Sequence, residues 1–140
     1  MEALYLETSA LLAWLLGEPE AEEVRCLVDS AGTVVTSVLT LLEANRSLLR
    51  AEHREELKAA EREKLGGVLR KVQAGWFVME ISGDVRRRAA RAFPREPVRT
   101  LDAIHLSTAL LFAGAYDDFG VLSFDHRIVS NLEPLGLRRV

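Results

Sequence analysis

Short apolar or β-branched runs alternate along the chain with segments whose apolar residues recur at helical spacing, and this alternation restricts the fold more than any other feature. The run at residues 3–6 is followed by helical spacing over residues 10–15, and the β-branched run at residues 33–36 by a second such pattern over residues 38–49. Repeated strand-helix order is typical of a parallel sheet covered by helices. The sequence therefore predicts an α/β fold, with a parallel β-sheet flanked by α-helices.

The same reading extends to the rest of the chain. Strands are predicted at residues 3–6, 33–36, 76–81, 121–124 and 137–140. Helices are predicted at residues 10–15, 20–28, 38–49, 54–72, 84–93, 101–113 and 126–132, the fourth of them weakened or bent near Gly66 and Gly67.

Length and composition point to one ordinary globular domain. With 140 residues, 49% of them hydrophobic, the chain fits a single domain over residues 1–140. Its apolar stretches at residues 10–16 and 109–115 fall short of the roughly 20 residues that cross a bilayer, and no signal-peptide pattern precedes the first strand. We therefore expect a cytoplasmic protein. The single cysteine, Cys26, excludes an internal disulfide and a cysteine zinc site, and we expect it to be a small buried residue.

The charge pattern argues against wholesale electrostatic binding of nucleic acid, because the net charge is -3. A local basic face is still compatible with the sequence. Arginines at helical spacing near residues 86–99, with Arg87 and Arg91 among them, would form such a face for phosphates, and a merely solvated helix face is the alternative.

Several acidic residues fall where neighbouring strands of the predicted sheet end. Glu7 follows the first strand, Asp125 follows the run at residues 121–124, and Asp102 lies at the start of a helix. Ligands of open α/β sheets bind at the carboxyl ends of the strands, so these acids are expected to converge there. Glu43 lies in the helix after the second strand and is placed to lean over the same edge.

Each of these acids also has a local structural explanation. Asp102 and Asp125 can serve the starts of helices, where a carboxylate is favoured. Glu43 can pair with Arg46 or Arg50 along its own helix, and Glu7 can be a turn residue.

Four carboxylates in one cleft would repel each other unless a cation neutralised them. Oxygen ligands without a cluster of thiolates favour hard ions, so the expected cofactor is Mg²⁺ or Mn²⁺. Such an ion activates water and neutralises phosphate charge, which points to phosphodiester hydrolysis. His105 follows Asp102 by three residues, within hydrogen-bonding reach, but a histidine in an apolar helix is more often a core residue.

Four segments resemble the motifs of the PIN-domain ribonucleases, and in particular the VapC-type toxins of type II toxin-antitoxin systems. They are Tyr-Leu-Glu-Thr-Ser-Ala-Leu-Leu at residues 5–12, the helix around residues 43–46, Thr-Leu-Asp-Ala-Ile-His-Leu at residues 100–106, and Leu-Ser-Phe-Asp at residues 122–125. The resemblance covers essentially the whole chain, and the segment at residues 100–106 is its most specific part.

The resemblance implies a metal-dependent endoribonuclease. Glu7, Glu43, Asp102 and Asp125 fall on the acidic quartet of the family, with Glu7, Asp102 and Asp125 as metal ligands, and Ser9 and Ser123 fall on supporting hydroxyl positions. The family also implies an RNA substrate, a small antitoxin protein as partner, a homodimer, and contact with DNA only through the antitoxin.

One position departs from the family pattern, because the first acid is usually aspartate and here is Glu7. The extra methylene moves the carboxylate by about a bond length, which affects an ion that demands near-octahedral geometry. This leaves a second hypothesis, a catalytically weakened PIN scaffold that acts as a regulatory or RNA- or protein-binding module. A receiver domain or an aspartyl phosphatase does not fit, since all lysines lie in mid-chain and position 7 is not aspartate.

Overall fold

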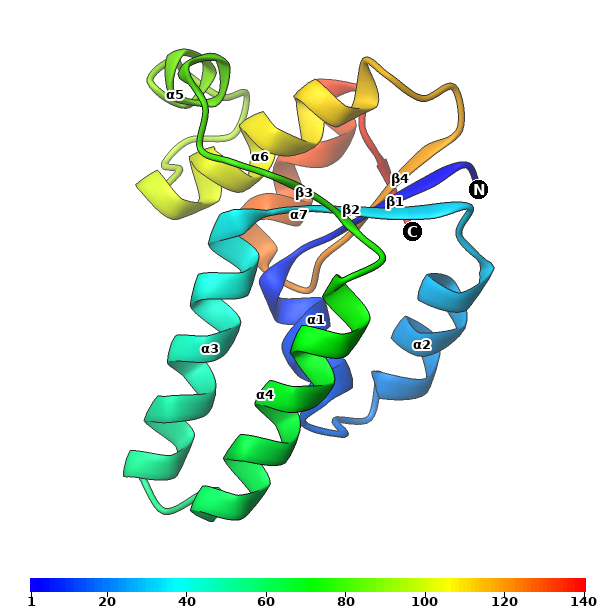
Figure 1. Cartoon of the computed structure of the whole chain (residues 1–140). Helices are drawn as coiled ribbons and strands as arrows, with labels where there is room; N and C mark the ends of the chain where they lie inside the picture. Colours follow the sequence, from blue (N-terminus) through cyan, green and yellow to red (C-terminus); the bar gives the residue numbers. More distant parts are fainter.

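A five-stranded parallel sheet forms the centre of the molecule, as the sequence predicts (Figure 1). The structure is a computed structural model that describes residues 1–140. The order of the strands across the sheet is β3-β2-β1-β4-β5, and every neighbouring pair is parallel. The strands are β1 (Ala3–Leu6), β2 (Thr33–Ser37), β3 (Phe77–Met79), β4 (Phe119–Leu122) and β5 (Arg138–Arg139).

Helices cover both faces of this sheet. Figure 1 shows α1 to α4 on one side and α5 to α7 on the other. The helices are α1 (Thr8–Leu15), α2 (Ala21–Ser30), α3 (Val38–His53), α4 (Ala59–Gln73), α5 (Gly83–Ala89), α6 (Thr100–Ala113) and α7 (His126–Leu132), followed by a short 3₁₀ turn at Glu133–Leu135.

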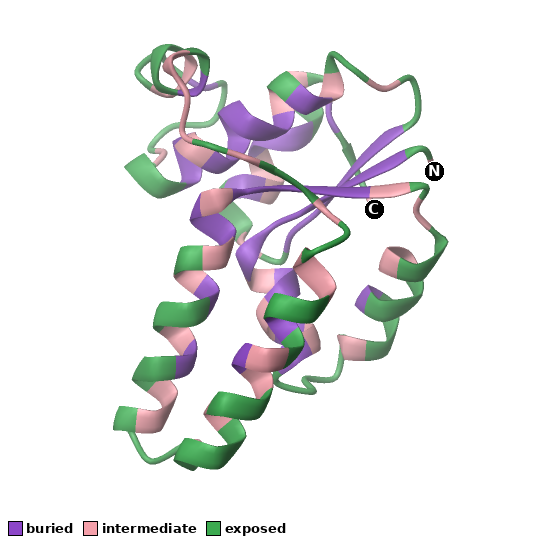
Figure 2. Cartoon of the chain, in the orientation of Figure 1, coloured by how far each residue is buried: buried purple, intermediate pink, exposed green.

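The central strand β1 divides the apolar interior into two cores. Its residues are all buried (Figure 2), and successive side chains point to opposite faces of the sheet. Ala3 and Tyr5 pack in the core under α6 and α7, whereas Leu4 and Leu6 pack in the core under α1 to α4. A parallel strand covered on both faces needs such a continuous apolar run.

The register of β1 and β4 determines where the candidate site forms. Leu6 lies opposite Leu122, so the residues that follow, Glu7 and Ser123, leave the sheet at the same edge. Ser37 ends β2 nearby and caps α3, where its hydroxyl accepts a hydrogen bond from the Leu39 N–H. The carboxyl ends of the strands therefore gather the polar positions that the sequence placed there.

Several predicted boundaries were wrong. Strand β4 ends at Leu122, before the predicted residue 124. The Ser123 hydroxyl after it donates a hydrogen bond to Glu7 and accepts one from the Asp125 N–H, so the chain leaves the sheet here. Helix α4 starts at Ala59, five residues later than predicted, after a turn in which Glu55 has a positive φ of 60°. The same helix runs unbroken through Gly66 and Gly67, with Leu69 buried against the sheet.

Other elements are shorter than predicted. Strand β3 covers only Phe77–Met79 at an edge of the sheet, and α5 ends at Ala89, after which Phe93 packs into the core as a loop residue. Cys26, expected to be buried, is exposed on α2, because only Val24 of that helix is buried. No helix of the structure is long and apolar enough to cross a membrane.

Candidate metal centre and active site

Glu7 is the first residue after β1 and caps helix α1. One of its carboxylate oxygens, Oε2, accepts hydrogen bonds from the Ser9 backbone N–H at 3.0 Å, from the Ser9 hydroxyl, and from the Ser123 hydroxyl at 2.8 Å. The residue is only 4% exposed. A buried carboxyl group is tolerated when hydrogen bonds replace its water, and these three donors fix the position of Oε2.

The two serines tie this carboxylate to the loop after β4. Ser9 Oγ donates to Glu7 and accepts from the Phe124 N–H at 2.8 Å. Ser123 Oγ also donates to Glu7, and it accepts from the Asp125 N–H at 3.1 Å. Both hydroxyls therefore connect the end of β1 to the segment that carries Asp125.

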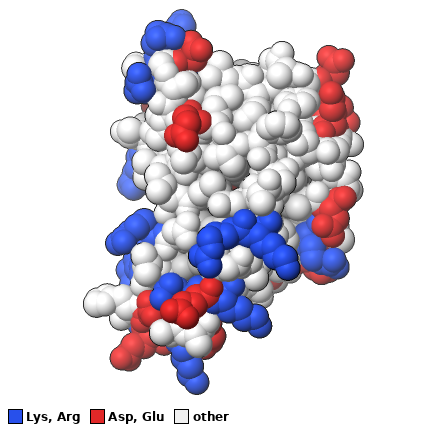
Figure 3. Space-filling model, in the orientation of Figure 1, with Lys and Arg blue, Asp and Glu red and all other residues white.

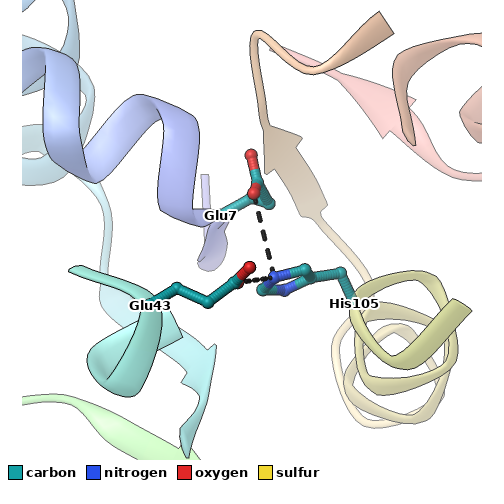
Figure 4. Close-up of side chains that lie close together, drawn as sticks. All are labelled: Glu7, Glu43 and His105. Carbon is teal, nitrogen blue, oxygen red and sulfur yellow. Dashed lines mark hydrogen bonds and ion pairs between the residues drawn. The ribbon is translucent and has the colours of Figure 1, made fainter. Parts of the chain in front are cut away.

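Glu43 reaches the same place from α3. Its Oε1 atom accepts a hydrogen bond from the Thr8 hydroxyl at 2.7 Å and another from His105 Nε2 at 2.6 Å, while Glu7 Oε1 lies 3.8 Å from that nitrogen. Figure 4 shows Glu7, Glu43 and His105 pointing toward one another from three different elements. Burial alone would raise the pKa of Glu43, but the hydrogen bonds from His105 and Thr8 outweigh it and lower the pKa.

His105 occupies the centre of this arrangement and is 2% exposed. Because a carboxylate can only accept, Nε2 carries a proton and donates it to Glu43. Burial, with the negative charge of Glu7, raises the pKa of Tyr5 well above its usual value, so the Tyr5 hydroxyl keeps its proton. That hydroxyl lies 3.0 Å from Nδ1 and can donate to it, which orients the ring toward Glu43.

Asp102 and Asp125 form the other side of the site. Asp102 lies in the first turn of α6, where its Oδ2 accepts the Arg99 N–H at 3.4 Å. Asp125 caps α7, and its Oδ1 accepts the Arg127 and Ile128 N–H groups. Burial, together with the nearby charge of Asp125, raises the pKa of Asp102. The two aspartates are therefore close enough to repel each other.

All four carboxylates share one feature. In each of them one oxygen accepts every hydrogen bond, and the other oxygen has no hydrogen-bond partner in the protein. The tied oxygens are Glu7 Oε2, Glu43 Oε1, Asp102 Oδ2 and Asp125 Oδ1. Four carboxylates with a free oxygen each match the oxygen ligands that Mg²⁺ and Mn²⁺ prefer.

An imidazole lies beside these carboxylates. Ligand atoms of Glu7, Glu43 and His105 all lie within 4.8 Å of one another. The sequence favours a core residue at position 105, with Asp102 as a possible hydrogen-bond partner. In the structure His105 is buried, and its hydrogen-bond partner is Glu43 rather than Asp102. The one available sequence signal was its position one turn after Asp102, which places both residues on the same face of α6.

The structure also shows which of the acids have the local structural roles that the sequence allows. Glu43 makes no ion pair with Arg46 or Arg50, but bonds with Thr8 and His105 from other elements. Asp102 and Asp125 do serve the starts of their helices, and Glu7 is itself the cap of α1. These structural roles occupy one oxygen of each residue and leave the second oxygen available.

The predicted arginine face lies apart from these carboxylates, on α5 and the loop after it. Arg87 forms an ion pair with Asp84 one turn away, and both line a shallow hollow with Arg91. Figure 3 shows basic side chains at the α5 end of the molecule with acidic ones among them. The pairing with Asp84 reduces the positive charge that Arg87 can offer to a phosphate.

Comparisons with known proteins find relatives over almost the whole chain. The family model described as "PIN domain" matches residues 4–131. Ribonuclease VapC35 of Mycobacterium tuberculosis is 32% identical over 136 residues, which cover 96% of this chain and 93% of that protein. Ribonuclease VapC46 of the same organism is 31% identical over 138 residues, which cover 98% of this chain and 95% of that protein.

Solved structures share the fold at lower identity. FitAcB from Neisseria gonorrhoeae superimposes with a TM-score of 0.72 at 15% identity, and covers 97% of this chain and 95% of that one. VapBC2 from Rickettsia felis, solved with a DNA fragment from its promoter, gives a TM-score of 0.67 at 12% identity over 99% of this chain and 97% of that one. VapC20 of Mycobacterium tuberculosis, described as a toxin that cleaves the sarcin-ricin loop, gives 0.60 at 17% identity over 91% and 93% of the two chains.

Proposed function

The chain belongs to the PIN-domain family, and from this premise we propose that it is a metal-dependent endoribonuclease that acts as the toxin of a VapBC-type toxin-antitoxin pair. The observation that carries the proposal is the free oxygen on each of four candidate carboxylates: Glu7 and Glu43, which meet at His105, and Asp102 and Asp125, whose charges repel each other. Each of these oxygens reaches solvent, because the only buried side-chain atoms without a hydrogen-bond partner are Thr40 Oγ1 and Ser107 Oγ, so each is open to an ion from solution.

Glu7, Asp102 and Asp125 are the residues that would hold Mg²⁺ or Mn²⁺. When bound, such an ion lowers the pKa of a water ligand and neutralises charge on the phosphodiester. The chain itself positions the ligands. Ser9 and Ser123 orient Glu7, and backbone N–H groups orient Asp102 and Asp125.

Glu43 has a separate role in this proposal. Its lowered pKa keeps it ionised at neutral pH, and its Oε2 atom has no donor in the protein. That oxygen is available to orient a water molecule and accept its proton. His105 and Thr8 fix the other oxygen, so the carboxylate cannot turn away.

The rival hypothesis of a weakened scaffold rests on Glu7 in place of aspartate. Here the longer side chain folds back onto Ser9 and Ser123 with one oxygen, and the other oxygen lies 3.8 Å from His105 Nε2. The extra methylene thus leaves a free oxygen among the other candidate ligands, and no observation favours loss of activity.

The partners follow from the same family membership. We expect a small antitoxin protein, and exposed leucines on α3, Leu42 at 56% and Leu49 at 40%, give it an apolar surface to bind. VapBC2 was solved with a DNA fragment from its promoter and FitAB with an IR36 DNA fragment, which supports contact with DNA when the chain is in complex with its antitoxin. We also propose that the chain forms a homodimer, acts in the cytoplasm, and is one PIN domain over residues 1–140.

Cleavage of a mixed panel of RNAs tests the proposal. Purified chain free of antitoxin would be assayed with Mn²⁺, Mg²⁺ or EDTA, beside the variant Asp102→Asn and the control Asp117→Asn, which alters an exposed aspartate without an ion pair. Metal-dependent cleavage that Asp102→Asn abolishes and Asp117→Asn retains is the expected result. Full activity of folded Asp102→Asn would contradict the assignment of the site.

A further inference from the structure

An open cavity of about 910 Å³ adjoins the carboxylates on the side of Asp125. Its wall includes Asp125 itself, the neighbouring residues Phe124 and Arg127, and Arg95 from the loop before α6. We call this cavity the Phe124 groove. It begins at a residue of the proposed catalytic site and extends away from it, as a subsite for a long substrate would.

Two cations in the groove have no partner. Neither Arg95 nor Arg127 makes an ion pair. The lining of the groove therefore combines two guanidinium groups with two carboxylates, those of Glu96 and Asp125. Guanidinium groups bind phosphate with two parallel hydrogen bonds, so the groove suits a phosphodiester.

Both carboxylate oxygens of Glu96, the acid on the loop side of the groove, are occupied by backbone donors of its own loop. The Glu96 carboxylate accepts the Phe93 N–H at 2.9 Å with one oxygen and the Val98 N–H at 2.6 Å with the other. It is therefore engaged in holding its own loop, and no arginine pairs with it.

Phe124 adds an apolar surface to the same lining. The residue is 36% exposed. The Phe124 N–H donates to Ser9 Oγ, and Ser123 and Asp125 on either side are hydrogen-bonded as well. The ring is thus held in place by its backbone while part of its surface stays open to the groove.

The opposite wall of the groove is also rigid. Asn131, which is fully buried, accepts the Arg95 N–H at 2.8 Å and donates to the Arg95 carbonyl oxygen at 3.0 Å. Because both backbone groups of Arg95 are fixed from α7, its side chain starts from a defined position. A preformed groove loses little conformational entropy when a ligand binds.

We propose that the Phe124 groove binds one unpaired nucleotide next to the scissile phosphodiester, with the base stacked on Phe124 and the phosphate between Arg95 and Arg127. This inference rests on the proposed function and assigns a nucleotide subsite to Phe124, Arg95 and Arg127. An aromatic ring stacks most readily on a base that is unpaired. Proteins that bind single strands combine such rings with basic side chains that contact the backbone.

Equilibrium binding separates this inference from the cleavage reaction. Fluorescence anisotropy would measure binding of a labelled single-stranded oligoribonucleotide, and of the same strand in a duplex, in the Asp102→Asn background with EDTA. Phe124→Ala would be compared with Phe124→Trp and with Phe77→Ala, which removes an exposed phenylalanine from the distant edge strand β3. Arg95→Ala and Arg127→Ala would be compared with Arg54→Ala, at the far end of α3.

The expected result is a preference for the single strand. Phe124→Ala should weaken its binding by roughly 5- to 100-fold, and Phe124→Trp should restore it. Arg95→Ala and Arg127→Ala should each lower the slope of log affinity against log salt by about 0.7, and neither Phe77→Ala nor Arg54→Ala should change either value.

Two contrary outcomes have different meanings. If Phe124→Ala binds the single strand as tightly as Phe77→Ala does while the active chain still cleaves RNA with metal, the subsite is wrong and the proposed function stands. If the parent protein binds no RNA and the active chain cleaves none, the proposed function fails, and the subsite fails with it.

Discussion

The four candidate catalytic carboxylates fall into two pairs that are held in different ways. Glu7 and Glu43 accept hydrogen bonds from side chains that are far away in the sequence, Ser123 and His105. Asp102 and Asp125 accept only backbone N–H groups at the starts of their own helices. We call these the side-chain-held pair and the backbone-held pair.

The difference appears in their proton affinities. Although burial opposes it, hydrogen bonding lowers the pKa of Glu43, whereas burial and the charge of Asp125 raise the pKa of Asp102. The fold itself therefore stabilises Glu43 in its ionised form. Asp102 is repelled by Asp125, and the charges of Arg127 and His105 offset only part of this, so a divalent cation would relieve the remainder.

Within the side-chain-held pair and the groups that support it, the largest effect should follow from Glu43→Gln, which keeps the shape of this side chain and replaces its carboxylate with a neutral amide. We expect cleavage to fall about a thousandfold, because ion and water positioning contribute several kcal/mol and each 1.36 kcal/mol is a factor of ten. Initial rates of RNA cleavage in Mn²⁺ measure this. The control Glu23→Gln on the surface of α2 should be fully active, and equal rates for both variants would refute a role for Glu43.

The second-largest effect should follow from His105→Leu, which we expect to lower kcat/KM or the Mn²⁺ affinity about a hundredfold. Groups that orient metal ligands typically change metal affinity or activity by about 10- to 100-fold. His105 is a positioning residue in this account. His105→Gln keeps a donor near the position of Nε2 and should recover part of the loss.

A purely structural role for His105 gives a different pattern. Both variants would then lower the melting temperature in parallel with activity, and His105→Gln would recover nothing. Melting curves recorded beside the kinetics distinguish the two cases.

Ser123→Ala should have a smaller effect, about tenfold in metal affinity, because Glu7 keeps both hydrogen bonds from Ser9. Calorimetric titration with Mn²⁺ measures the change. Ser130→Ala alters a serine of α7 whose hydroxyl bonds only to its own helix and serves as the control. Unchanged affinity in Ser123→Ala would mean that the link between β1 and the Asp125 loop does not orient the ligand.

The smallest predicted effect is a gain in stability rather than a loss of activity, and it concerns Asp102→Asn. Because the folded-state pKa of Asp102 is raised, ionisation of this group costs the folded state free energy at every pH above that pKa. In EDTA at neutral pH, Asp102→Asn should therefore melt at a slightly higher temperature than the unsubstituted chain. The gain should vanish as the pH falls below the unfolded-state pKa of an aspartate, where both forms are neutral, and a gain independent of pH would contradict repulsion as the cause.

Sequence patterns predict the backbone of this site better than its contacts. The strand run of Ala3–Leu6 and the helix that carries Asp102 were predicted because burial on both faces and helical periodicity leave direct traces in the sequence. The convergence of the acids follows from the rule that strands end at one edge. The limits of β3 and the late start of α4 depend on packing and turn geometry that a single sequence does not display.

Contacts between distant elements lie beyond such patterns. That His105 bonds with Glu43 rather than with Asp102 depends on how α3 packs against α6 across 62 positions of the chain. The groove lined by Arg95 and Phe124 likewise depends on Asn131, which holds the Arg95 backbone. Asn131 is a polar residue, and the residues next to it in the sequence do not indicate that it is buried. The predicted arginine group near residues 86–99 includes Arg95, but spacing singled out Arg87 and Arg91 within it, and Arg127 lies outside it.

The most direct test of the account is to locate Mn²⁺ by anomalous diffraction in crystals of the antitoxin-free chain. The account predicts a peak within about 2.2 Å of free carboxylate oxygens from both pairs, Glu7 on one side and Asp102 and Asp125 on the other. A peak that contacts neither pair, or crystals that take up no Mn²⁺ at concentrations that support cleavage, would contradict the claim that these four carboxylates form the metal centre.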